Sequence, residues 1–271
     1  MTIPRVLSIA GSDSGGGAGI QADLKTFFRF NTYGMTAMTA LTAQNTVGVQ
    51  DVYPVSDAFV AAQIDSVAED IGFDAAKTGM LGDAAIVAVV AERINHWGIH
   101  PLVVDPVMVA KSGDRLLQKE AIEVMMKQLL PRTTIVTPNI HEAEIMLHDS
   151  IATVRDMEAA AEAFLQLGCQ AVVIKGGHLG GETSVDVYRD ATRSKRLCDR
   201  RIRTLNTHGT GCTFASAIAA GLAHGWDPLK AVGTAKRYVT RAIRYSLDLG
   251  EGHGPTNHWA SFDTCEGNDT S

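Results

Sequence analysis

The chain has 271 residues, of which 45% are hydrophobic and 20% charged, and this composition excludes a disordered or fibrous protein. Its 24 basic and 30 acidic residues give a net charge of −6, which argues against a nucleic-acid or membrane-surface partner. The longest apolar run, within residues 84–91, is far shorter than the roughly 18 residues of a membrane span, and we expect no signal peptide. Four separated cysteines without a CxxC pair favour a reduced, cytoplasmic compartment.

Short β-type runs alternate with segments of helical period along most of the chain. Helices are predicted after the Gly-rich loop 11–19, after the capping residues Asp57 and Asp83, over 121–130 and 155–167, and from Asp227-Pro228 onward. The predicted strands cover residues 5–10, 35–42, 75–78, 102–105, 135–137 and 171–175. Such alternation predicts an α/β fold with a mostly parallel central sheet flanked by helices on both faces.

Residues 183–203 interrupt this alternation. Two β-like runs, 185–188 and 195–202, flank a polar turn and predict a small β-hairpin flap. Its arginines could face a polyanion, although a solvated hairpin is the simpler interpretation. We find no internal repeat, and we expect one domain over residues 1–271 with a loosely structured tail after about residue 250.

Two Gly-rich loops follow predicted strands, where ligands bind in open α/β sheets. The first, residues 11–19, matches neither a P-loop nor a dinucleotide fingerprint, so it is a backbone-lined ligand loop or a tight turn. The second, residues 206–213, precedes a small-residue helix, and its N–H groups would form a nest for an anion. Cys212 lies at this helix start, which predicts a lowered pKa; the alternative is a buried small hydrophobe.

Four further polar residues stand at predicted strand ends. Asp105 follows 102–104 and suits a hard cation, Asn139 and Glu142 share one helix face, and Lys175 is placed to neutralise a phosphate. The alternatives are a turn cap, a helix cap and a solvated lysine. Together these groups supply charge neutralisation, positioning and a proton acceptor, which are the requirements of phosphoryl transfer.

Seven motifs follow one another over nearly the whole chain. They are AGSDSGGGAGIQADLKTF at 10–27, ALTAQNT at 40–46, KTGML at 77–81, VDPVMVAKSG at 104–113, TPNIHEAE at 137–144, VIKGGH at 173–178 and NTHGTGCT at 206–213. This set resembles the hydroxymethylpyrimidine/phosphomethylpyrimidine kinases of thiamine biosynthesis, a family of the ribokinase superfamily.

The resemblance implies a ribokinase-like fold, ATP and Mg²⁺ as cofactors, and a homodimer. It also implies two successive reactions, in which 4-amino-5-hydroxymethyl-2-methylpyrimidine is phosphorylated and its monophosphate is then converted to the diphosphate. The nearest alternative is a pyridoxal kinase on the same scaffold. Two more distant alternatives are a thiol hydrolase that uses Cys212 with His208 and a catalytically silent binding protein.

The resemblance also assigns roles to individual residues. Asp105 and Glu142 belong to the magnesium network, and Asn139 and Lys175 lie near the ATP phosphates. Cys212 stands where most ribokinase relatives have an aspartate base. The anion hole is formed by Gly209, Thr210, Gly211 and Cys212, and the pyrimidine is surrounded by Gly11, Asp23, Gln44, Met80 and Val107.

Gln44 has a physical rationale of its own. A carboxamide presents one donor and one acceptor side by side, as when Asn or Gln reads adenine, and a 4-aminopyrimidine presents the complementary pair. The alternative is a polar residue that merely finishes the strand predicted over 35–42.

Overall fold

The computed structural model describes residues 2–108, 117–177 and 179–261 of the chain. The motif residues 109–113 and His178, and also Cys265, lie outside the described residues.

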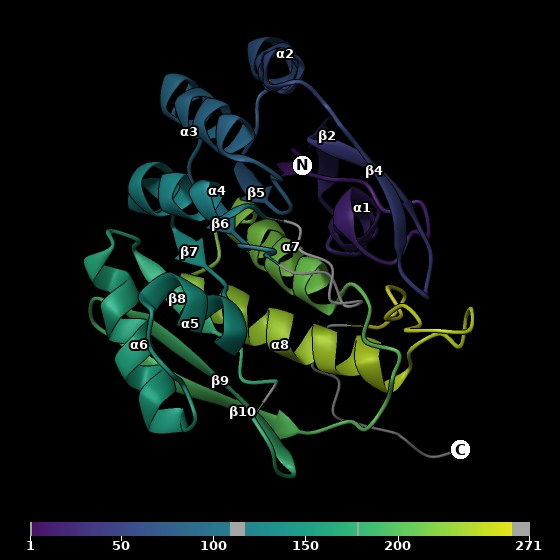
Figure 1. Cartoon of the computed structure of the whole chain (residues 1–271), viewed down its shortest axis with the longest axis vertical. Coiled ribbons are helices and arrows are strands. Elements are labelled where there is room, and N and C mark those ends of the chain that lie inside the picture. Colours follow the sequence, from purple (N-terminus) through teal and green to yellow (C-terminus); the bar gives the residue numbers. More distant parts are fainter. Residues whose placement is uncertain (1, 109–116, 178, 262–271) are drawn as a thin grey trace.

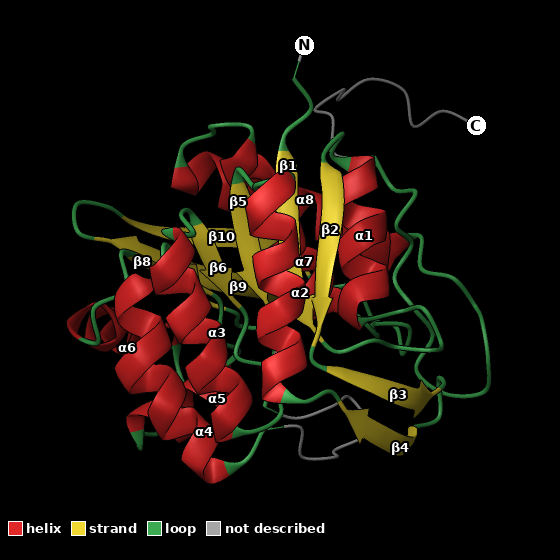
Figure 2. Cartoon of the chain, turned by 90° about the horizontal axis from the view of Figure 1, so that it is seen from above, coloured by secondary structure: helices red, strands yellow, loops and turns green. Residues whose placement is uncertain are grey.

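An eight-stranded sheet forms the centre of the molecule, in the order β10-β9-β8-β7-β6-β5-β1-β2 (Figures 1 and 2). Six strands are parallel, as predicted: β1 (Arg5–Ala10), β2 (Tyr33–Met38), β5 (Ala75–Thr78), β6 (Leu102–Val104), β7 (Ile135–Val136) and β8 (Ala171–Ile174). Parallel pairing brings the carboxyl ends of these strands to one edge of the sheet, where the predicted site residues follow them.

Helices cover both faces of the sheet because alternate strand residues point to opposite sides. Val6 packs with α1 (Gly19–Arg29), α7 (Thr210–Ala223) and α8 (Pro228–Arg244). Its neighbour Leu7 belongs to the opposite apolar core, which α2 (Asp57–Asp70), α3 (Ala84–Trp97), α4 (Lys119–Val124), α5 (Ile140–Leu147) and α6 (Val154–Gln166) complete. After α4 the chain continues as a π-helical turn (Met125–Leu129) and a 3-10 turn (Leu130–Arg132). The predicted α/β class with helices on both faces is therefore confirmed.

Helix starts follow the predicted capping chemistry with one exception. Asp83 caps α3 and Asp227 caps α8, whose first residue is Pro228. At α2, however, Ser56 is the cap, and its hydroxyl accepts from the Phe59 N–H at 3.3 Å. The prediction that Asp57 caps this helix was wrong by one residue, because Ser56 has the extended backbone that a cap requires.

The strand predicted over residues 35–42 is in fact two strands in different sheets. β2 ends at Met38, and Thr39 turns the chain by donating its N–H to the Ala10 carbonyl (3.1 Å) and its hydroxyl to the Met80 carbonyl (2.6 Å). β3 (Ala40–Gln44) then pairs with β4 (Val49–Pro54) in a separate two-stranded sheet, visible beyond the end of β2 in Figure 2. This turn carries Gln44 across the edge where the functional loops lie.

The hairpin predicted within 183–203 consists of β9 (Thr183–Asp190) and β10 (Ser194–Arg200). It is not a free flap, because β9 pairs antiparallel with β8 and thereby extends the main sheet. The small separate hairpin sheet of this fold is β3–β4.

The segment from Gly250 to Ser261 forms no named helix or strand, yet it is packed against the body of the protein. Thr256 and His258 are buried, and the Tyr238 hydroxyl donates to the His258 carbonyl at 3.0 Å. None of the helices within the described residues combines the length and apolar character needed to cross a membrane.

Candidate active site

A cavity of about 590 Å³ opens at the carboxyl edge of the main sheet. It is bordered by loops that follow β1, β6, β7 and β8, by the end of β3 and by the start of α7. Every predicted site residue except Asp23 borders it: Gly11, Gln44, Met80, Asp105, Val107, Asn139, Glu142, Lys175, Gly209, Thr210, Gly211 and Cys212. Gly11 and Cys212, which are 201 positions apart in the sequence, thus border one cavity.

Asp23 corrects the sequence-based prediction. It is fully buried, and its carboxylate oxygens lie 3.0 and 2.9 Å from the ammonium group of Lys77 on β5. The hydroxyls of Ser8 and Ser216 donate to the same carboxylate at 2.5 and 2.6 Å. These partners occupy the carboxylate, so Asp23 holds Lys77 from behind the cavity wall and does not border the cavity.

Lys77 is a functional candidate that the sequence analysis missed, although it opens the KTGML motif. Its side chain is completely buried and borders the cavity. Burial opposes its positive charge, but Asp23, Cys212 and Asp105 outweigh burial and raise its pKa. Lys77 is therefore a permanent cation beneath the site.

The anion nest is predicted at the start of α7. Gly209 is its N-cap with φ +78°, and a Cβ there would lie 1.7 Å from the Gly17 carbonyl oxygen. The position therefore requires glycine both for its backbone angle and for close contact with the first Gly-rich loop. The first amides of a helix have no partner within the helix, so this turn is able to bind an anion.

Below the nest lies an ion pair between Lys175 and Asp105. The Lys175 ammonium group is 2.8 Å from Asp105 Oδ1. A Cβ on Gly211 would lie 3.4 Å from Asp105 Oδ2 and 3.5 Å from Lys175 Nζ, so this glycine lets both charged groups approach the nest. Burial opposes the charge of Lys175, but Asp105 and Glu142 raise its pKa.

Asn139 and Glu142 form a capping box at the start of α5. Asn139 Oδ1 accepts from the Glu142 N–H at 2.9 Å, and Glu142 Oε2 accepts from the Asn139 N–H at 2.8 Å. The helix-cap alternative for Asn139 is thus realised, while both residues also border the cavity. Burial and the nearby Asp105 raise the pKa of Glu142, and Lys175 opposes the shift.

These carboxylates fit a magnesium ion that binds together with phosphates. Asp105 and Glu142 are buried in one cavity and repel each other, a repulsion that a cation would relieve. Among the described residues there is no cluster of three or more His, Cys, Asp or Glu side chains suited to a metal. Mg²⁺ is usually held by one or two carboxylates, substrate phosphates and water, so two carboxylates suffice.

The pKa of Cys212 is shifted in the direction opposite to the predicted one. Burial raises its pKa to about 11, although Lys77 and the Gly19 amide oppose the shift, and Asp23 and Asp105 add to it. The prediction of a lowered pKa was wrong because desolvation of the thiolate outweighs the helix dipole and the neighbouring cation. At neutral pH the group is a thiol.

The same cavity also carries the residues expected around the pyrimidine. Gln44 ends β3, and its Oε1 accepts from the Thr42 hydroxyl at 3.3 Å. Met80 packs over Gly11, where a Cβ would lie 2.3 Å from the methionine Cε. Val107 has φ +37°, a strained angle for a β-branched residue, and such strain is often found at functional sites.

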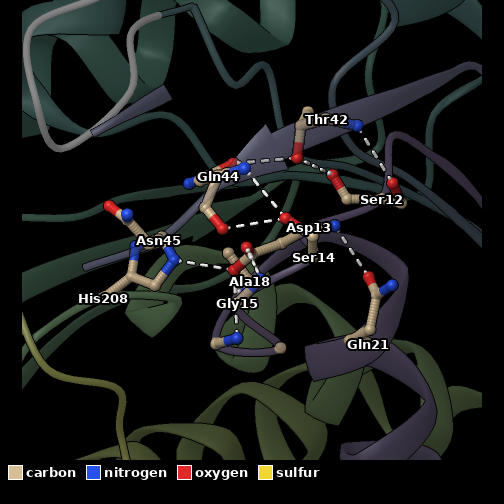
Figure 3. A network of polar contacts seen from close by, with 12 residues as sticks. Ser12, Asp13, Ser14, Gly15, Ala18, Gln21, Thr42, Gln44, Asn45 and His208 are labelled. Atoms are coloured by element: carbon tan, nitrogen blue, oxygen red, sulfur yellow. Dashed lines mark hydrogen bonds and ion pairs between the residues drawn. The ribbon is translucent and has the colours of Figure 1, made fainter. Parts of the chain in front are cut away.

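Two further polar pairs border the cavity, and of their members the sequence analysis named only His208, as a possible hydrolase partner of Cys212. Asp13 and His208 form a pair between the two Gly-rich loops (Figure 3), and both belong to quoted motifs that could have indicated them. Asp186 on β9 accepts from Lys236 on α8 at 2.8 Å and from the Gly176 N–H at 2.9 Å. No sequence motif marked this second group, which only the fold brings together.

The family model described as phosphomethylpyrimidine kinase matches residues 13–257 of the chain. The hydroxymethylpyrimidine/phosphomethylpyrimidine kinase of Bacillus subtilis (strain 168) is 45% identical over 261 residues, which cover 96% of this chain and 96% of that protein. The thiamine biosynthesis bifunctional protein ThiED of Geobacter sulfurreducens is 50% identical over 254 residues. That match covers 93% of this chain but 52% of the relative, so the chain spans about half of that longer protein.

A solved structure of similar fold is the ADP complex of Bacillus subtilis pyridoxal kinase. Its TM-score is 0.89 at 42% sequence identity, and the alignment covers 96% of this chain and 98% of that one.

Proposed function

Because the chain belongs to the phosphomethylpyrimidine kinase family, we propose that its cavity carries out two successive phosphoryl transfers. The chain is a phosphotransferase of thiamine biosynthesis. ATP phosphorylates the hydroxymethyl group of 4-amino-5-hydroxymethyl-2-methylpyrimidine, and the resulting monophosphate is then converted to the diphosphate. One observation carries this proposal. The Asp105–Lys175 ion pair lies against Gly211 of the nest, and Gln44 borders the same cavity.

The end of the cavity with the nest would hold the ATP phosphates. Lys175 and the amides of Gly209, Thr210 and Gly211 would neutralise charge on the transferred group, and Asn139 would lie beside the phosphates. Asp105 and Glu142 would hold Mg²⁺, which when bound neutralises phosphate charge and orients the phosphates. Use of ATP is supported by the ADP complex of the related pyridoxal kinase.

The pyrimidine would lie at the other end, against Gln44, Met80, Val107 and Gly11. Thr42 occupies one lone pair of Gln44 Oε1, which leaves the amide N–H₂ and the second lone pair for the aminopyrimidine edge.

Proton transfer distinguishes the two reactions. In the first, the hydroxymethyl oxygen bonds to the γ-phosphorus, the bond from phosphorus to the β-phosphate oxygen breaks, and the hydroxyl proton leaves. Cys212 would accept that proton as the thiolate, which is a minor form at neutral pH because of its raised pKa. The acceptor in the second reaction is an ionised phosphate, so that reaction needs no base.

The test is ADP release by the purified protein with three acceptors: the hydroxymethylpyrimidine, its monophosphate and pyridoxal. We expect turnover with both pyrimidines. Turnover with pyridoxal alone would replace the proposal by the second candidate, a pyridoxal kinase, which the similarity to the pyridoxal kinase structure favours. Release with none of the three would contradict a kinase of this substrate class.

We also propose a homodimer and a reducing, cytoplasmic compartment. The small sheet β3–β4 leaves Leu41 and Tyr53 exposed, which suits contact with a second copy. The described cysteines Cys169, Cys198 and Cys212 are free thiols, as expected under reducing conditions. A solution mass equal to that of one chain would contradict the dimer.

A further inference from the structure

The two Gly-rich loops of the cavity are joined by one side-chain pair. His208 Nε2 lies 2.8 Å from Asp13 Oδ2, and the two residues are 195 positions apart in the sequence (Figure 3). Asp13 is 1% exposed, while the His208 side chain is 12% exposed at the cavity wall. A short contact between two nearly buried polar groups fixes the separation of the segments that carry them.

On one side of the pair, Asp13 organises the first loop. Its carboxylate accepts from the N–H groups of Gly15 (2.8 Å), Gly17 (3.0 Å) and Ala18 (2.8 Å). Burial opposes the negative charge, but His208 and the amides of Ala18 and Gly15 lower the pKa of Asp13. The carboxylate is therefore ionised at neutral pH and holds the whole loop.

The same loop is linked to the pyrimidine end of the cavity. The Asp13 N–H donates to Gln21 Oε1 at 2.8 Å, and the next residue, Ser14, both donates to the Gln44 carbonyl and accepts from the Gln44 N–H at 2.8 Å. Figure 3 shows these contacts running from Gln44 through Ser14 and Asp13 to His208. The backbone of the pyrimidine-reading residue is thus attached to the loop that the carboxylate organises.

On the other side, His208 directly precedes the anion nest. Its backbone N–H donates to the Gly254 carbonyl at 3.1 Å and its carbonyl accepts from the Thr256 N–H at 3.2 Å, so its main chain is attached to the segment that follows α8. A Cβ on the next residue, Gly209, would lie 1.7 Å from the Gly17 carbonyl oxygen, and a Cβ on Gly17 would lie 2.5 Å from Cδ2 of the His208 ring. A shift of His208 would therefore move the nest relative to the first loop.

We propose that Asp13 and His208 are a positioning pair that sets the separation between the pyrimidine end and the anion nest, and so aligns the acceptor hydroxyl with the transferred phosphoryl group. This proposal rests on the proposed function. The pair touches neither reacting atom in this account; it acts through Gln44 on one side and Gly209 on the other. A misplacement of about 1 Å between reacting groups can lower a rate by about 10²-fold.

Three variants test the pair. His208→Leu removes the nitrogen, whereas His208→Gln places an amide N–H₂ at a similar reach, and Asp13→Asn replaces one acceptor oxygen by a donor. His224→Leu is the matched control, because this histidine also makes a 2.8 Å contact, to the Phe30 carbonyl, outside the cavity. Steady-state kinetics with the hydroxymethylpyrimidine and ATP, and melting temperatures, are measured for each.

For His208→Leu we expect kcat to fall by about 10²-fold while both KM values change little, because each half of the site keeps its own contacts. His208→Gln should restore most of the loss, and the control should retain the wild-type kcat. Asp13→Asn should lower kcat at least as much as His208→Leu does. The double variant Asp13→Asn/His208→Leu should have a kcat no lower than that of the slower single variant.

A wild-type kcat in His208→Leu would contradict the positioning role of the pair. A His208→Gln variant that folds but is as slow as His208→Leu would contradict it as well. Should His208→Leu fail to fold, Asp13→Asn with a wild-type melting temperature and an unchanged kcat would overturn it instead. A wild-type protein that does not phosphorylate the pyrimidine contradicts the proposed function, whereas an active wild type with unaffected variants contradicts only the pair.

Discussion

The ammonium group of Lys77 lies 2.9 Å from the nearer carboxylate oxygen of Asp23, and neither side chain has any exposed surface. The pair lies between α1 and β5, behind the cavity wall, and Ser216 on α7 donates to the same carboxylate. Loss of either charge would leave the other buried and unpaired. The pair therefore contributes both to folding and to the electrostatics beneath Cys212.

Lys77→Met is expected to lower the free energy of unfolding by about 3–5 kcal/mol, because it leaves the Asp23 carboxylate uncompensated in the interior. Urea denaturation measures this loss. The exposed pair of Lys127 and Glu123 provides the control, since Lys127→Met should cost about 0–1 kcal/mol. A cost for Lys77→Met within that small range would mean that the buried pair is not an ion pair.

Cys212 should be a slow nucleophile at neutral pH. With a pKa of about 11, less than about one thiol in 10³ is ionised at pH 7.5, and only the thiolate is alkylated. Peptide mapping after iodoacetamide treatment should show labelling of Cys212 that rises steeply with pH above 8, with the exposed Cys198 as the internal reference. Rapid labelling at pH 7 would show that the helix start dominates over burial.

Cys212→Ser tests the role of the thiolate in catalysis. We expect a loss of about 10²–10⁴-fold for phosphorylation of the hydroxymethyl compound and a much smaller loss for the monophosphate. Below pH 11 the wild-type rate of the first reaction should rise with pH, and this rise should disappear in the variant. Equal losses in both reactions would show instead that Cys212 shapes the anion nest.

Asp105→Asn should lose most of the turnover, because the variant weakens both the proposed magnesium site and the 2.8 Å pair with Lys175. A magnesium titration of kcat/KM should recover part of the loss at high concentration. Glu142→Gln should shift the same titration in the same direction. Wild-type kinetics of Asp105→Asn at ordinary magnesium would remove Asp105 from the metal site.

Gln44→Leu should weaken pyrimidine binding by about 1–3 kcal/mol, or about 5–150-fold in KM, because the aminopyrimidine edge is left without partners. The KM for ATP should stay close to the wild-type value. Gln50→Leu, on the neighbouring strand β4 and away from the cavity, is the matched control. A selective rise in the KM for ATP would reverse the placement of the two substrates.

His258 should make the protein less stable in acid. Burial, with a small contribution from Lys25, lowers its pKa from 6.5 to about 4, and the neutral ring contacts the Thr213 hydroxyl at 3.0 Å. Between pH 6.5 and 4 the unfolded chain binds a proton that the folded protein excludes, so the free energy of unfolding falls as the pH falls, by about 3 kcal/mol in total. In His258→Gln this part of the pH dependence should disappear, whereas the exposed His96→Gln should keep it.

The sequence by itself determined the alternation of strands and helices and the residues that follow the strand ends. Apolar runs of period 2 and 3.6 are local signals, and cap residues such as Asp83 and Asp227 act within one helical turn. Because parallel strands end at one edge, placing Asp105 and Lys175 after strands was enough to predict that they lie along the same edge, where the structure pairs them at 2.8 Å. The glycines of the nest were also recognisable as a Gly-rich loop, and the structure supplies the reasons: Gly209 has φ +78°, and a Cβ on Gly211 would contact Asp105 and Lys175.

Only the tertiary structure decided what each polar group faces. Asp23 and Lys77 are 54 positions apart, so no local pattern shows that they neutralise each other behind the wall rather than border the cavity. The break at Thr39 depends on carbonyls of Ala10 and Met80, which folding alone brings near. For the same reason, the pKa of Cys212 is raised, although its place at a helix start predicts a lowered value. The helix start is visible in the sequence, but the desolvation that outweighs it comes from distant segments packed around the thiol.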